Sequence, residues 1–122
     1  MNDLKNLSFA TRLRFAFAGL GHAIRSERSV RTQLMFLLAV LAALAYWRPP
    51  AVWWALVLLI SSAVIAAELF NTAIERLADQ LQSEPHPQIR IIKDCAAAAV
   101  LVLSAGALCV AAALALSLWS TR

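Results

Sequence analysis

The sequence predicts an all-α integral membrane protein that forms one domain (1–122), with an N-terminal amphipathic surface helix followed by three transmembrane helices. Hydrophobic residues make up 61% of the 122 residues, above the roughly 45–50% of a soluble domain. They are concentrated in three long runs, separated by proline-containing breaks. A basic segment with an apolar stripe precedes the first run. Together these observations exclude a soluble globular domain and favour a small helical membrane protein.

Residues 7–32 are expected to form a helix that lies in the membrane interface. Its apolar stripe consists of Phe9, Leu13, Phe17, Leu20 and Ile24. Arg14, Arg25 and Arg28 lie on other faces, and this combination is typical of an interfacial helix. The alternative is a helix that packs on another soluble element, but the chain offers little soluble protein for it to contact.

The three apolar runs predict transmembrane helices over about 32–48, 51–82 and 92–119. The first run has about 16 residues between Arg31 and Arg48, which is enough to span if both arginines extend toward the interfaces. It is expected to act as its own insertion signal, because residues 1–31 lack the apolar core of a signal peptide. Pro49 and Pro50 separate the first two runs, and SEPHP (83–87) separates the last two.

The basic residues predict the orientation in the membrane. Nine of them lie on the predicted inner side: Lys5, Arg12, Arg14, Arg25, Arg28, Arg31, Arg76, Arg90 and Lys93. Two, Arg48 and Arg122, lie on the other side. This asymmetry places the N terminus and the 68–94 region in the cytoplasm and the C terminus outside. The net charge of +4 is then a signal for topology and lipid headgroups, and no nucleic-acid partner is expected.

The second run ends in a group of polar residues that share one side of a helix. Relative to Glu68, Asn71 lies at roughly −60°, Glu75 at −20° and Asp79 at +20°, with Thr72 nearby. We call these residues the acidic face. A solvated helix end would scatter its charges, so the clustering indicates a site.

The depth of each residue predicts its chemistry. Glu68 lies about 17 residues after Ala51, or roughly 26 Å along a helix, near the cytoplasmic edge of the hydrocarbon. A partly desolvated carboxylate there can serve as a base near neutral pH. The more hydrated acids suit Mg²⁺, which binds one or two carboxylates, waters and substrate phosphates. Glu27 and the pair Lys93-Asp94 are expected at the same border, and the small residues 96–99 should let the third span approach the second closely.

The segments ELFNTAIERLAD (68–79) and KDCAAAAV (93–100) resemble the prokaryotic diacylglycerol kinase family, whose pattern is E-x-x-N-[ST]-A-I-E-x-x-x-D followed by K-D. The resemblance covers nearly the whole chain. It implies transfer of the γ-phosphate of MgATP to the hydroxyl of a membrane lipid, in the bacterial inner membrane. It also implies a homotrimer with composite sites between subunits, facing the cytoplasm.

By this resemblance, Glu68 is the catalytic base and Glu27 and Glu75 are the magnesium ligands that hold ATP. Asn71, Lys93 and Asp94 orient the nucleotide phosphates and the catalytic centre. Asp79 matches the acid of the motif, without an assigned role. No phosphate-binding loop of the G-x-x-x-x-G-K-[ST] type is present, so metal and basic side chains must hold the phosphates.

The acceptor lipid stays open between diacylglycerol, which would give phosphatidic acid, and undecaprenol, which would give undecaprenyl phosphate. Gln33 stands where diacylglycerol-type members often carry Glu. The segment RFAFAGLGHAIRSERSVR (14–31) and the loop EPHP (84–87) resemble the undecaprenol kinase branch, and LLISS (58–62) resembles the diacylglycerol branch. We favour diacylglycerol because it is the commonest activity of the family.

Two other classes compete with an enzyme. A small multidrug-type transporter would place its glutamate near the midplane, usually among four spans, whereas here the acids gather at one border. A non-enzymatic membrane adaptor would need no phased acidic face. ATP consumption that depends on a lipid alcohol distinguishes an enzyme from both.

Overall fold

The computed structural model describes residues 6–122 and is helical throughout its regular structure. It contains four helices: α1 (Phe9–Ser26), α2 (Arg28–Trp47), α3 (Ala51–Leu81) and α4 (Pro87–Ser120). Three of these helices, α2, α3 and α4, are long and apolar enough to cross a membrane. The all-α fold with three potential spans is therefore confirmed. Lys5, which we counted among the inner basic residues, lies outside the described residues.

The breaks between the long helices lie at the proline-containing segments, as the sequence predicts. α2 closes on Arg48, whose backbone is left-handed (φ 50°) and whose N–H donates to the oxygen of Leu44. Pro49 and Pro50 follow, and α3 starts directly after them. α4 starts at Pro87, five residues before the predicted start of the third span at about residue 92. The side chain of His86 accepts a hydrogen bond from the N–H of Gln88 and so caps the helix at this earlier point.

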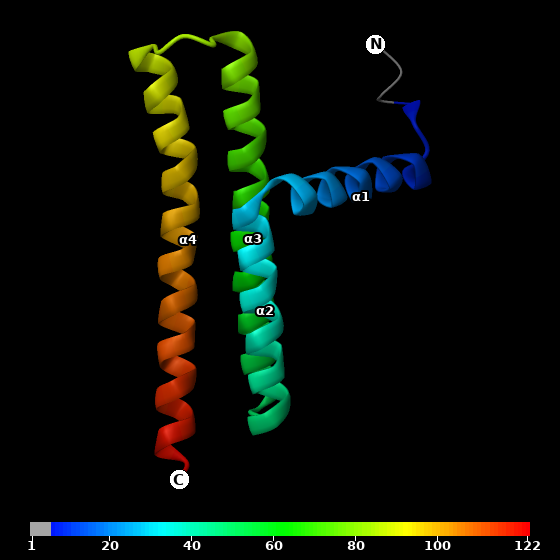
Figure 1. Cartoon of the computed structure of the whole chain (residues 1–122). Helices are drawn as coiled ribbons and strands as arrows, with labels where there is room; N and C mark the ends of the chain where they lie inside the picture. The colour runs from blue at the N-terminus through cyan, green and yellow to red at the C-terminus, as the bar shows by residue number, and fades with distance from the viewer. Residues whose placement is uncertain (1–5) are drawn as a thin grey trace.

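A bend at Glu27 divides the segment predicted as one surface helix. Glu27 has extended backbone angles (φ −110°, ψ 116°), so residues 28–32 belong to α2. On either side of the bend, Ala23 and Val30 are 5% and 0% exposed. Buried contacts thus fix the point where the chain turns. Figure 1 shows α1 leaving the bundle sideways from this point, with much of its length away from the other helices.

α3 is the central helix of the bundle. It contacts α1, α2 and α4, whereas within the described residues the backbones of α2 and α4 stay apart. The three long helices run antiparallel to their neighbours in sequence, so the 82–86 loop and the C terminus lie at opposite ends (Figure 1). Small residues allow α4 to approach α3: Ala96 is buried, and a Cβ on Gly106 would lie 3.4 Å from Cδ1 of Ile60. Of the alanines expected at this contact, those at 97–99 are exposed instead.

Candidate active site

The acidic face is carried by α3, which continues unbroken from the apolar run to Leu81. Exposure increases along it: Glu68 is buried, Asn71 and Glu75 are half-buried, and Asp79 is exposed. Figure 1 shows this end of α3, together with the start of α4, extending beyond the level at which α1 leaves the bundle. The carboxylates of the acidic face therefore become more exposed to solvent from Glu68 to Asp79.

Glu68 is the buried charged side chain of the described chain, with 8% of its surface exposed. Neither Glu68 nor Glu75 forms an ion pair with a basic side chain of residues 6–122. A buried carboxylate without a cationic partner is unfavourable in a purely structural position. Such a placement is more typical of a functional group than of a packing residue.

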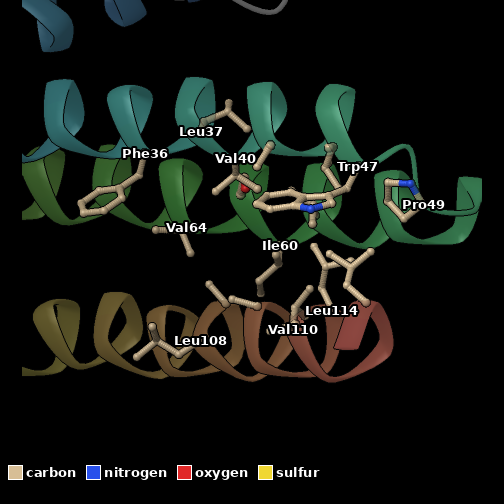
Figure 2. A pocket seen from close by; sticks show the side chains of 18 of the residues that line it. Phe36, Leu37, Val40, Trp47, Pro49, Ile60, Val64, Leu108, Val110 and Leu114 are labelled. Atoms are coloured by element: carbon tan, nitrogen blue, oxygen red, sulfur yellow. The ribbon is translucent and has the colours of Figure 1, made fainter. Parts of the chain in front are cut away.

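An apolar cavity of about 770 Å³ lies between α2, α3 and α4, and we call it the apolar trough. Figure 2 shows Phe36 and Val40 from α2, Ile60 and Val64 from α3, and Leu108 from α4 around it. It extends from Gln33 and Val64 to Pro49, Trp119 and Arg122.

Glu68 is not one of the lining residues of this trough but lies just beyond one of its ends. It lies one helical turn after Val64 on the same side of α3, and helical side chains lean toward the N terminus of their helix. The Cα–Cβ bond of Glu68 is therefore tilted toward Val64, which lines the near end of the trough. The sequence did not predict the trough, because it forms only when three segments pack together.

Asn71 carries an unpaired acceptor. Its Oδ1 is shielded from solvent and has no hydrogen-bond partner within residues 6–122. The residue lines a second, smaller cavity of about 340 Å³ between α3 and α4, together with Ala96 and Ala99. An unsatisfied buried acceptor costs about 1–3 kcal/mol, so a donor group of a ligand would be stabilised there.

Lys93 and Asp94 lie in the polar first part of α4, about two turns after its start at Pro87, and pair with different residues. Lys93 Nζ forms an ion pair with Asp79 across the α3–α4 contact. Asp94 Oδ1 lies 3.6 Å from Nε of Arg90, one turn earlier on α4. The sequence alone assigned no role to Asp79, and the structure shows that it pairs with Lys93.

Glu27 pairs with Arg76, a residue that sequence reasoning did not select. Arg76 Nη2 lies 2.8 Å from Glu27 Oε1, and the same side chain contacts His22 and Ser26. The available signal was a basic residue beside the acidic face, about 80° from Glu68 around the helix. The contacts of Arg76 with His22 and Ser26 on α1 could not be predicted from the sequence, because they depend on the bend at Glu27.

The donor set fits Mg²⁺ only in part within one chain. Glu27 and Glu75 supply carboxylate oxygens, and Mg²⁺ needs only one or two of these beside waters and phosphates. Residues 6–122 contain no group of three or more side chains of metal-ligand type close enough to hold an ion. The chemistry of the donors therefore suits Mg²⁺ bound together with a phosphate ligand, and not a closed protein cage.

Comparison with known proteins gives one consistent result. The family model described as prokaryotic diacylglycerol kinase matches residues 14–115. The diacylglycerol kinase of Synechocystis sp. is 34% identical over 98 residues, which cover 80% of this chain and 56% of that protein. The undecaprenol kinase of Bacillus subtilis is 32% identical over 92 residues, covering 74% of this chain and 75% of that protein. The chain thus spans just over half the length of the cyanobacterial relative.

Proposed function

The chain belongs to the prokaryotic diacylglycerol kinase family, and on this basis we propose that it is a multi-pass membrane lipid kinase that uses ATP. It transfers the γ-phosphate to a lipid hydroxyl, with diacylglycerol as the favoured acceptor and phosphatidic acid as the product. One observation carries the proposal beyond the family. A buried, unpaired carboxylate, Glu68, lies one helical turn beyond Val64, a lining residue of the apolar trough, at the start of the polar end of α3.

This position suits a reaction between a lipid and a water-soluble nucleotide. The trough offers the hydrocarbon of the acceptor a dry path along α3, and its hydroxyl then lies beside Glu68. The Glu68 carboxylate takes the proton of the lipid hydroxyl while the hydroxyl oxygen attacks the γ-phosphorus of ATP. The bond between the γ-phosphorus and the oxygen of the leaving ADP breaks in the same step. General-base catalysis of this kind needs a carboxylate within hydrogen-bond reach of the hydroxyl.

The nucleotide is held by the more hydrated groups. We assign Glu27 and Glu75 as the residues that would hold Mg²⁺, which when bound neutralises charge on the phosphates. Lys93, Asn71 and Asp94 position the phosphates and the catalytic centre. Phosphoryl transfer depends mainly on such positioning and charge neutralisation.

We further propose a homotrimer in the bacterial inner membrane, with α1 in the cytoplasmic interface. Phe9 and Phe17 on α1 are 79% and 65% exposed, which suits a helix whose apolar stripe enters the interface. One chain alone brings no three metal-ligand side chains together in residues 6–122. Acids from neighbouring subunits would complete the site.

Undecaprenol is the second candidate acceptor. The Bacillus subtilis relative bears the name undecaprenol kinase and is covered over three quarters of its length. The lining of the trough is apolar apart from Gln33, two serines and the terminal Arg122, so it accommodates acyl or isoprenoid chains alike.

The deciding experiment offers each lipid separately. Purified protein in lipid micelles receives MgATP with diacylglycerol, with undecaprenol, or with no lipid alcohol, and kcat/KM is compared from phosphorylated lipid and released ADP. We expect ADP release only when a lipid alcohol is present, and a higher kcat/KM for diacylglycerol. ADP release that is equal in all three samples, without lipid product, would contradict a lipid kinase.

A further inference from the structure

Two arginine side chains contact the bend between α1 and α2, one from α2 and one from α3. From α2, Arg31 Nη1 donates to the backbone oxygens of Ile24 and Arg25, both at 2.9 Å. These bonds satisfy carbonyls that the end of α1 leaves free. From α3, Arg76 reaches the same bend at Glu27. The direction in which α1 leaves the bundle is therefore set by two arginines.

Arg76 makes three polar contacts with the end of α1. Nη1 donates to His22 Nε2 at 2.6 Å, and Nη2 donates to Ser26 Oγ and to Glu27 Oε1, both at 2.8 Å. A guanidinium has five N–H donors in one fixed plane. It can hold three acceptors at once, which the compact ammonium of a lysine cannot reproduce with the same geometry.

Both contacts to the Glu27 carboxylate use the same oxygen. Besides Arg76, Ser26 Oγ donates to Oε1 at 3.4 Å. No hydrogen bond to Oε2 is formed by the part of the chain that the structure describes. The carboxylate is thus oriented through one oxygen and presents the other, as is usual when an outer donor orients a metal ligand.

Stability is a poor explanation for this arrangement. The side chain of Arg76 is 48% exposed and that of Glu27 is 27% exposed, and partly exposed ion pairs contribute little to stability. The three contacts of the Arg76 guanidinium instead fix the position of the end of α1 and of the Glu27 carboxylate relative to α3.

We propose that Arg76 is a positioning residue for the binding of MgATP. It holds the α1–α2 bend against α3 and, by engaging Oε1 of Glu27, leaves Oε2 available for the Mg²⁺ that Glu27 would hold. This inference rests on the proposed function, since Glu27 binds a metal only if the protein uses MgATP.

The first test separates nucleotide binding from turnover. In Arg76→Gln, the apparent KM for MgATP should rise about 10–100-fold, the usual effect of removing an outer partner of a metal ligand. The kcat at saturating MgATP and the KM for the lipid should stay within about two-fold of the wild type, since Arg76 touches neither reacting group. Arg76→Lys, which keeps the charge but loses the fork, should recover only part of the KM. Arg12→Gln, which removes an exposed arginine of α1, is the matched control and should behave as wild type.

The second test needs no catalysis. Spin labels at exposed positions 16 on α1 and 80 on α3, with Cys95 and Cys109 replaced by alanine, report the distance between these helices without nucleotide. Labelled protein is diluted with unlabelled protein so that only pairs within one chain contribute. Arg76→Gln should broaden the narrow distribution of the wild-type residue, and Arg12→Gln should not.

The outcomes distinguish this inference from the proposed function. A wild-type protein without lipid-dependent ATP use contradicts the proposed function and the metal role of Glu27 together. An active wild type whose Arg76→Gln variant keeps the same KM for MgATP, or the same distance distribution, overturns the positioning role. A lower KM in the variant also overturns it, because Arg76 would then compete with the metal for Glu27. If Arg76→Gln does not assemble, Arg76→Lys and Ser26→Ala are judged by the same criteria.

Discussion

Glu68 differs from the other acids of the described chain because it combines burial with the lack of a cationic partner. Glu27, Asp79 and Asp94 each pair with a basic side chain. An unpaired carboxylate at a dry position is free to accept a proton from a substrate. The paired acids remain charged beside their cations and are less suited to accept that proton.

Replacing Glu68 with Gln removes this proton acceptor at nearly constant size. We expect kcat to fall by about 10²–10⁴-fold, the usual contribution of general-base catalysis, with little change in the KM for ATP. Steady-state kinetics on the assembled fraction, isolated by size-exclusion chromatography, provides the measurement. A variant that assembles normally and keeps most of its turnover would rule out the base.

Asn71 offers a test in which stability and activity should separate. Asn71→Leu removes the unpaired Oδ1, whose burial costs about 1–3 kcal/mol, so the Tm in micelles should stay equal or rise. Activity should fall by at least about ten-fold, because the amide no longer accepts from a bound ligand. A joint loss of Tm and activity would instead assign the amide to the fold.

Among the helices, α3 determines the arrangement because it contacts all three others. Its apolar part forms the floor of the trough, and its polar end carries the acidic face. Gly106 of α4 lies against the side chain of Ile60 on α3, and small residues commonly occupy such contacts between membrane helices. The site therefore depends on the α3–α4 contact.

Gly106→Leu tests that contact against a matched glycine. A Cβ at Gly106 would lie 3.4 Å from Ile60 Cδ1, an ordinary van der Waals distance, so the further carbons of leucine must displace the Ile60 side chain or α4 itself, at a cost of about 1–3 kcal/mol. A Cβ at Gly19 would meet nothing within 4 Å, so Gly19→Leu should be neutral or gain up to about 1 kcal/mol from helix propensity. Thermal unfolding in micelles compares the two, and equal Tm values would mean that α4 does not depend on this approach.

In the molecule as a whole, the antiparallel order of the three long helices places the 82–86 loop and the C terminus at opposite ends (Figure 1). If all three helices cross the membrane, reporters at these places must lie on opposite sides. Together with the basic asymmetry, this predicts a cytoplasmic loop and an external C terminus. Reporter fusions within residues 83–87 and after Arg122 give the measurement. Both reporters on one side would mean that α4 does not cross.

The proposed trimer predicts complementation between inactive chains. If Glu68 and Glu75 of one subunit meet Glu27 or Lys93 of a neighbour, a mixture of Glu68→Gln and Glu27→Gln chains contains some sites with both carboxylates intact. Such mixtures should recover part of the wild-type activity, whereas each variant alone does not. Well-mixed oligomers without recovery would place each site within a single subunit.

The class of the protein, the number of long helices and the order of the acidic face could all be predicted from the sequence. These features depend on local patterns: runs of apolar residues, proline breaks at Pro49, Pro50 and Pro87, and the helical spacing of Glu68 and Asn71. Each part of the family motif lies within a single helix, residues 68–79 in α3 and 93–100 in α4, so it too could be read directly from the chain.

The bend at Glu27, the link from Arg76 to α1 and the apolar trough became visible only in the folded chain. Each of these joins segments far apart in the sequence: Arg76 lies 49 residues from Glu27, and the trough takes its lining from three helices. Helical periodicity states which side chains share a face, but not which face of another helix they meet. That choice is made by packing, here by the burial of Val30 and Leu44 between neighbouring helices and by the close approach at Gly106.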